Sequence, residues 1–170
     1  MAEIHLQQLR NDKMKNIIRI ALAIVCIFCF SSLSASGATI DSLSVKPVNP
    51  EAEAITIYEV NFVLSDTLPS DAVITVTFPD GFDLSRVKLA GSSTINGGFK
   101  VSVEDSVVTI TRTGLGREIP PGQKVEIKFG NVKNPTVPKV GYPISTSIWN
   151  RSGKRIAEEQ ISNVTIEPKS

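Results

Sequence analysis

Hydrophobic and polar residues alternate along most of residues 39–170, as they do in strands with one buried face. The clearest case is Ile74-Thr-Val-Thr-Phe78, whose apolar side chains would all lie on one face. No stretch keeps the i, i+3, i+4, i+7 spacing of an amphipathic helix. We therefore predict eight or nine short strands, around Leu43–Val45, Ile55–Leu64, Ile74–Phe78, Val87–Leu89, Phe99–Val103, Val107–Thr111, Val125–Phe129, Ile144–Ile148 and Val164–Ile166.

The second predicted strand breaks its own alternation. Ile55 and Ile57 fall on one face, whereas the apolar residues from Val60 onward fall on the other. A β-bulge inserts one residue and shifts the register of a strand in this way. We therefore predict a bulge near Tyr58 and Glu59.

Turn residues separate the strands. Pro79 cannot donate to a ladder, and Asp80-Gly81 suits a turn because glycine adopts a positive φ without strain. Pro120-Pro-Gly122 would turn the chain into the strand around Val125. Prolines and glycines between residues 130 and 141 mark a stiff connection of the kind that crosses between sheets.

The acids near the first of these turns allow a second interpretation. Asp80 and Asp83 could join Asp66 or Asp71 from a neighbouring loop to bind calcium. Such hard cations take six to eight oxygen ligands, and no dense Asp-x-Asp-x-Asp-Gly spacing supplies them here. The favoured interpretation is a structural corner, with no metal bound.

Short strands with Gly, Pro, Asn and Asp between them are typical of an antiparallel sandwich. One ordered set of motifs resembles the immunoglobulin-like β-sandwich repeats of bacterial and archaeal surface-layer and adhesin-type proteins: Phe78-Pro-Asp-Gly-Phe82, Ile119-Pro-Pro-Gly122, Gly130-Asn-Val-Lys-Asn-Pro135 and Gly141-Tyr142. The resemblance covers most of residues 42–150. It implies an all-β, antiparallel immunoglobulin-like β-sandwich that serves as a spacer or adhesive unit and has no catalytic residues.

The first 38 residues have the pattern of an N-terminal signal peptide helix. Lys13, Lys15 and Arg19 form a basic region, an apolar run covers residues 20–30, and small residues follow. The run is shorter than the about 20 residues that span a bilayer. We predict cleavage before residue 39, with a possible start at Met14 and an uncleaved anchor as the alternative. Residues 39–170 would then be one exported, extracellular or cell-surface domain.

Removing this leader also removes both cysteines and the single histidine. Residues 39–170 carry 14 Lys and Arg against 15 Asp and Glu, which argues against nucleic acid because its binding needs a basic patch. A Ser-His-acid triad and a Cys/His zinc site are excluded from this part of the chain. No acid pair stands out in an apolar setting, so we expect no enzyme activity and no cofactor.

Trp149 is the strongest candidate for a binding residue. It shares a strand face with Ser145 and Ser147, so its indole should face solvent or cover the turn over residues 150–153. Arg151, Lys154 and Arg155 follow closely. Trp supplies contact area and Arg supplies directed donors at binding surfaces. Trp149 and Arg151 are therefore candidate binding residues, although the indole could serve only to cover its own turn.

Two segments share a pattern of apolar, hydroxyl, apolar, charged and proline residues: Leu43-Ser-Val-Lys-Pro47 and Val164-Thr-Ile-Glu-Pro168. In an array of tandem modules, such a segment could begin the next module. We expect a non-enzymatic structural or adhesive module whose partners are other surface proteins, copies of itself through short edge strands, or surface glycans. A carbohydrate-binding module is the alternative function. Contact with a membrane is expected only through an uncleaved leader.

Overall fold

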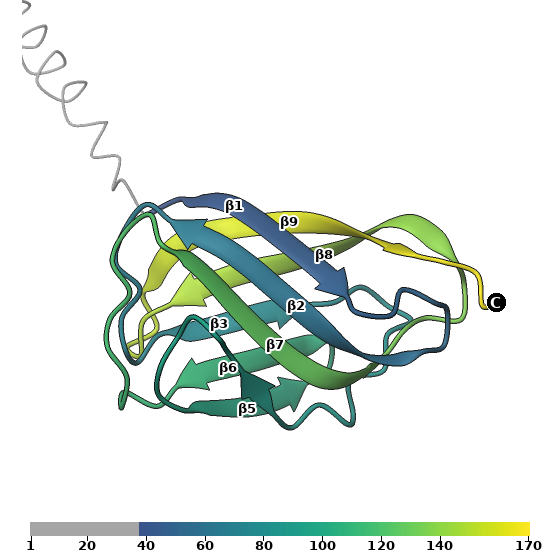
Figure 1. The fold of residues 1–170 in the computed structure, drawn as a ribbon, viewed down its shortest axis with the longest axis horizontal. Coiled ribbons are helices and arrows are strands. Elements are labelled where there is room, and N and C mark those ends of the chain that lie inside the picture. The colour runs from purple at the N-terminus through teal and green to yellow at the C-terminus, as the bar shows by residue number, and fades with distance from the viewer. Residues whose placement is uncertain (1–37) are drawn as a thin grey trace, which may run out of the picture. The chain divides into compact units, whose positions relative to one another are not determined.

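The computed structural model describes residues 38–170, which form two antiparallel sheets packed face to face (Figure 1). The predicted leader lies outside the described residues, apart from its last position. One sheet has the strand order β1-β2-β7-β4 and the other the order β5-β6-β3-β8-β9. The strands are β1 (Ile40–Pro47), β2 (Ile55–Leu64), β3 (Val73–Thr77), β4 (Ala90–Gly91), β5 (Phe99–Glu104), β6 (Val107–Arg112), β7 (Lys124–Lys133), β8 (Lys139–Trp149) and β9 (Arg155–Ile166).

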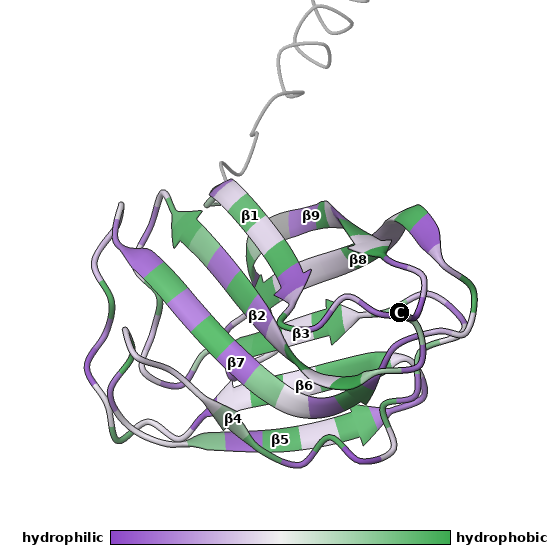
Figure 2. Ribbon diagram, turned by 45° about the vertical axis from the view of Figure 1, so that its right-hand side comes forward, coloured by the Kyte–Doolittle hydropathy of each residue, from purple (hydrophilic) through white to green (hydrophobic). Residues whose placement is uncertain are grey.

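This architecture confirms the predicted all-β antiparallel sandwich. Bands of hydrophobic and hydrophilic residues alternate along β2 and β7, as expected for strands that bury one face (Figure 2). Every predicted strand but one is present. Between residues 38 and 170, no helix has the length and apolar character needed to cross a membrane.

The strand predicted at Val87–Leu89 is wrong. Val87 closes a turn by donating its N–H to the carbonyl of Leu84 (3.0 Å), and pairing begins only at the two-residue strand β4. Val87 is buried, whereas Leu89 is 79% exposed. Val87 and Leu89 are separated by one residue and so fit the period-two pattern of a strand, although the backbone turns there.

The predicted bulge exists, but its geometry differs from the expectation. The register between β2 and β7 shifts between Thr56 and Tyr58, where Gly130 and Asn131 of β7 lie opposite Ile57. The extra residue therefore belongs to β7, and Asn131 has a positive φ of 64°. Because β2 itself keeps its alternation, the side chains of Ile55 and Ile57 remain outside.

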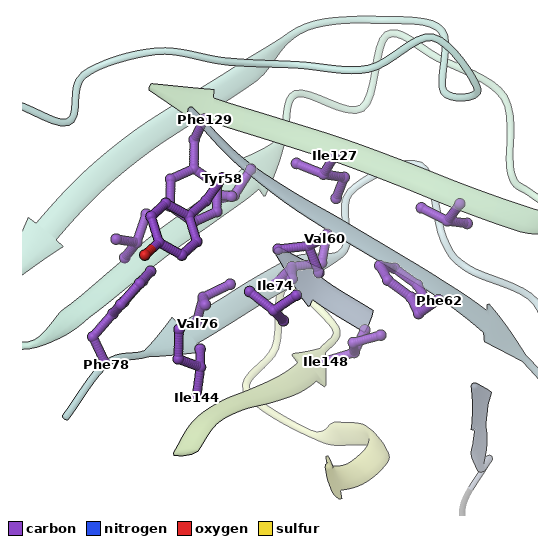
Figure 3. Close-up of a cluster of buried hydrophobic side chains, with 14 of the residues drawn as sticks. Tyr58, Val60, Phe62, Ile74, Val76, Phe78, Ile127, Phe129, Ile144 and Ile148 are labelled. Carbon is purple, nitrogen blue, oxygen red and sulfur yellow. The ribbon is translucent and has the colours of Figure 1, made fainter. Parts of the chain in front are cut away.

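The core between the sheets is a continuous set of aliphatic and aromatic side chains (Figure 3). At one end Phe78 contacts Tyr58, Phe82 and Phe129, with ring centroids 5.3, 5.1 and 6.1 Å away. Phe78 and Phe82 flank the Pro-Asp-Gly turn, so this turn returns a second ring to the core. The stretch is a structural corner, as its residue types predict.

The connection from β7 to β8 crosses between the sheets, as predicted, but it is shorter than expected. It covers only residues 134–138, because β8 already begins at Lys139. Tyr142 lies near its end and donates its hydroxyl to the carbonyl of Val137 (2.8 Å). Its ring packs against Phe82 at 5.3 Å, so Tyr142 anchors the connection to the aromatic end of the core.

Candidate binding face

The outer face of the five-stranded sheet carries mostly small side chains at its centre. Alternate residues of β6, β3 and β8 point away from the core and line up in rows across the sheet. None of the side chains in these rows is charged. The rows are Thr111–Val73–Trp149, Thr109–Thr75–Ser147 and Val107–Thr77–Ser145.

Thr75 holds Trp149 against this face. Its hydroxyl lies 3.4 Å from Nε1 of Trp149 and donates to the carbonyl of Ser147 at 3.3 Å. Thr75 and Ser147 are directly opposite each other on β3 and β8. The indole of the half-buried Trp149 therefore reaches across β3, and its only polar group is already in contact with a hydroxyl.

Arg155, and not Arg151, contacts the indole. Arg155 lies opposite Trp149 in the β8–β9 pair, and its guanidinium carbon is 4.7 Å from the ring centroid. Such cation–π contacts stabilise by about 0.5–1 kcal/mol at exposed sites. Arg151 lies exposed in the turn before β9. Its role as a binding residue stays a prediction, and the sequence placed Arg155 near Trp149 without selecting it.

The turn that places Arg155 is built around Asn150. Oδ1 of Asn150 accepts hydrogen bonds from the N–H of Lys154 and the hydroxyl of Ser152, both at 2.8 Å. Gly153 follows with a φ of +80°, which a glycine adopts without strain. This hairpin fixes the register at which Trp149 and Arg155 face each other.

The outer face of the other sheet is charged at its middle. Lys128 forms ion pairs with Glu59 (2.6 Å) and Glu126 (3.7 Å). The bond to Glu59 raises the pKa of Lys128, and a hydrogen bond from Ser93 lowers the pKa of Glu126. These ion pairs lie at the surface and are partly exposed, so they contribute little to stability.

One end of this second face carries an apolar hollow that the sequence did not predict. Ile55 and Ile57 are 53% and 44% exposed, and Val48 and Leu89 lie beside them at 60% and 79%. The bulged residues of β7 complete its lining. If unbroken alternation had been assumed along the whole of β2, both isoleucines would have been placed on the outer face.

Two of the acids considered for calcium bond to nearby backbone groups. Oδ1 of Asp83 accepts the N–H of Ser85 at 2.9 Å, and this bond is the main cause of the lowered pKa of Asp83. Asp66 accepts the N–H of Thr67 at 2.6 Å. Within residues 38–170, no three His, Cys, Asp or Glu side chains gather where they could hold a metal ion.

Comparison with known proteins bears on the fold alone. No protein-family model and no curated protein matches the chain. Among solved structures, it is similar to a cohesin module of a family 33 glycoside hydrolase from Clostridium perfringens, with 18% identity, a TM-score of 0.51, and coverage of 77% of this chain and 99% of the module. This likeness shows that residues 38–170 have the β-sandwich fold of a cohesin module.

Two other structures match with lower TM-scores. A non-cellulosomal cohesin from Archaeoglobus fulgidus is 10% identical, with a TM-score of 0.37 over 73% of this chain and 91% of its own. BslA, a bacterial hydrophobin, is 16% identical, with a TM-score of 0.40 over 78% and 99%. At these scores, neither match adds to what the first shows.

Proposed function

We propose that this chain is an exported, non-enzymatic module that binds another cell-surface or secreted protein through the outer face of its five-stranded sheet. The face formed by β6, β3 and β8 is the observation that carries this proposal. Its centre is uncharged, and a Trp–Arg pair lies at its end. Depletion of charge at the centre, together with Trp and Arg anchors, is typical of protein–protein interfaces.

Trp149 and Arg155 are the anchors in this proposal. Trp149 offers a large ring already held by Thr75, so little side-chain freedom is lost when a partner covers it. Arg155 is exposed beside it, and a guanidinium presents several donors that a partner can bond. The likeness to a cohesin module supports a non-catalytic module attached to or binding another protein, and the predicted leader supports export.

Variants of the face test the proposal. The immobilised chain would retain surface proteins of the source cells, which would then be cross-linked to it. Retention would be compared between wild type and Thr109→Lys, a substitution that puts a charge at the centre of the face. Lys124→Glu, an exposed change on the other sheet, is the matched control. We expect Thr109→Lys to lose at least tenfold in affinity for the retained protein and Lys124→Glu to change it by less than about twofold, since charges at a partner's core are costly whereas remote ones are not.

Equal retention by both variants would refute the use of this face. Carbohydrate binding remains the second candidate function, because Trp149 is the one tryptophan of residues 38–170. The guanidinium over its ring leaves a sugar less room to stack, which weighs against this candidate. Glycan arrays with wild type and Trp149→Ala separate the two: glycan binding that this substitution abolishes would favour the carbohydrate function.

A further inference from the structure

Strand β5 is an open edge of the five-stranded sheet. It comes first in the order β5-β6-β3-β8-β9 and lies along the lower border of the molecule in both Figure 1 and Figure 2. The opposite edge strand, β9, is bridged to the segments at the two ends of β1. Among the described residues, β5 pairs only with β6. One side of its backbone is therefore without a partner strand.

Alternate residues of β5 direct their backbone groups away from β6. The N–H of Thr113 donates to the carbonyl of Gly98 (3.0 Å), so the backbone of Gly98 faces the β6 side. Neighbouring residues of a strand direct these groups to opposite sides, and the β5–β6 register is regular. Unpaired edge groups are a template for another strand. The residues that offer them here are Phe99, Val101 and Val103.

This edge has few of the features by which proteins prevent pairing with another chain. β5 is six residues long and contains no proline, and its register with β6 has no bulge. Its only charged side chains are Lys100 and Glu104, both exposed on the outer face. Neither of them forms an ion pair within residues 38–170. A strand that pairs with this edge must therefore match one positive and one negative charge.

A second copy of β5 matches both charges in one antiparallel register. When Ser102 lies opposite the second copy's Ser102, each Lys100 lies opposite a Glu104. A shift of two residues in either direction places a serine, Ser102 or Ser106, opposite Lys100. A shift of one residue would turn the outer face of one strand toward the core. Opposite charges directly across an antiparallel pair attract, so the charge pattern of β5 is complementary to itself.

The same register suits the inner face of the strand. Val101 lies opposite the second copy's Val103, and the backbones of both residues face the open edge. Each such pair exchanges both of its N–H···O bonds. The two valine side chains are partly buried and pack against the core, so pairing covers the surface that they still expose. Lys100 and Glu104 meet in the other kind of pair, in which side chains approach more closely.

We propose that this chain forms a two-fold symmetric dimer by antiparallel pairing of β5 with β5 of a second copy. The interface is isologous, so each contact occurs twice. The two five-stranded sheets become one continuous sheet, and the faces formed by β6, β3 and β8 lie on the same side of it. The dimer does not depend on which partner those faces bind. Because the contact is one short strand per copy, we expect a weak dimer, with a Kd on the order of 10 µM to 1 mM.

Charge reversal in β5 tests the proposal. Sedimentation equilibrium of the full chain measures the Kd of the dimer for wild type, Lys100→Glu and Glu104→Lys. Each variant places like charges opposite each other twice, so we expect its Kd to rise at least about tenfold. An equimolar mixture of the two variants restores both opposite-charge pairs and should associate within about threefold of wild type. Lys124→Glu, on the other sheet, is the matched control and should change the Kd by less than about twofold.

Cysteine cross-linking tests the register, in a chain with Cys26→Ser and Cys29→Ser. Ser102→Cys places two thiols in a pair whose Cα atoms are about 4.5 Å apart, within the range for a disulfide. We therefore expect it to form an oxidised dimer. Lys100→Cys and Glu104→Cys should each fail to cross-link alone, because the matching cysteine of the second copy is displaced by about 13 Å along the strand. A mixture of these two variants should cross-link.

Several results would overturn the proposal. A monomer at about 1 mM chain, or association that neither charge reversal weakens, would exclude β5 as the contact. Failure of the mixed charge variants to associate would exclude the antiparallel register, as would cross-linking of Lys100→Cys with itself. Far-UV circular dichroism checks that the charge variants fold, which we expect because both side chains are exposed. If either variant unfolds, the cross-linking of Ser102→Cys decides the question.

Discussion

The hydroxyl of Tyr58 donates a 2.7 Å hydrogen bond to Oδ1 of Asn134, at the start of the connection that crosses between the sheets. Nδ2 of Asn134 in turn donates to the carbonyls of Asn49 (3.0 Å) and Glu51 (2.8 Å). Both side chains are buried, and these hydrogen bonds give the Tyr58 hydroxyl and the Asn134 amide the partners that buried polar groups need. One amide therefore ties β2, the loop before it and the crossing connection together.

Removing the hydroxyl of Tyr58 should destabilise the fold. Tyr58→Phe leaves Oδ1 of Asn134 buried without its donor, which costs about 1–3 kcal/mol in the free energy of unfolding. Urea denaturation measures this loss. Tyr142→Phe is the control, because its hydroxyl bonds to the carbonyl of Val137 at the exposed connection. A larger loss for Tyr142→Phe than for Tyr58→Phe would contradict the importance given to the buried amide.

Burial also makes Tyr58 a source of alkaline instability. Desolvation raises the pKa of Tyr58, whereas a tyrosine in the unfolded chain ionises near pH 10. Above about pH 10 the unfolded state thus loses a proton that the folded state keeps, so stability falls as pH rises. Denaturation at about pH 9 and pH 11 should show a smaller decrease for Tyr58→Phe than for wild type. Equal decreases would show that Tyr58 does not contribute.

Arg112 is a buried guanidinium held by three carbonyl groups at the end of β6. It is 2% exposed and donates to Leu68 (3.2 Å), to Pro69 and to Arg117 (2.6 Å). Desolvation lowers its pKa, which nearby Asp71 and Glu118 oppose. Lysine cannot reproduce the guanidinium fork.

Arg112→Lys should therefore cost about 1.5–3 kcal/mol in the free energy of unfolding, the range for hydrogen bonds to charged groups. Thermal or urea unfolding measures it. Arg117→Lys is the matched control, because the side chain of Arg117 is exposed and its backbone carbonyl is retained. Similar losses for the two variants would exclude a specific role for the buried guanidinium.

Thr146 offers an opportunity for stabilisation. Its side chain is fully buried on the inner face of β8, and its hydroxyl has no hydrogen-bond partner among the described residues. Thr146→Val keeps the branched shape and removes the unsatisfied group, so we expect a gain of about 1 kcal/mol. Thr109→Val, on the outer face, should stay within about 0.5 kcal/mol of wild type. A destabilised Thr146→Val protein would show that the hydroxyl is satisfied after all.

Truncating an isoleucine in β7 should cost much more stability than truncating one in β2. Ile127→Ala removes a side chain with no exposed surface and should cost about 2–5 kcal/mol. Ile57→Ala, at 44% exposure, should cost less than about 1 kcal/mol. Urea midpoints of the two variants test this difference. Comparable losses would contradict the outer position of Ile57.

Sequence reasoning succeeded where a local rule governs the backbone. Ile74, Val76 and Phe78 alternate with threonines, and the structure buries all three. It failed where a partner strand decides the outcome. The irregularity opposite Ile57 is absorbed by Gly130 and Asn131 of β7, about 70 residues away, and no local pattern in β2 reveals this.

The candidate site, too, was predicted only in part from the sequence. The face on which Trp149 lies follows from the alternation of β8 and is found where it was expected. Its neighbours do not follow from spacing alone. Arg155 reaches the ring because the hairpin register sets it opposite Trp149, and Thr75 does so because β3 lies beside β8. The sequence could not choose between Arg151 and Arg155 without that register.

The order of apolar and polar residues by itself determined that this chain forms strands, where most of them lie, and that Phe78-Pro-Asp-Gly-Phe82 is a corner. Those properties follow from backbone sterics and from burial of alternate side chains, which act within a few residues. Only the tertiary structure decided which strands became neighbours and which stayed unpaired. It thereby placed Asn134 against Tyr58, because contacts between distant segments depend on how the two sheets pack as a whole.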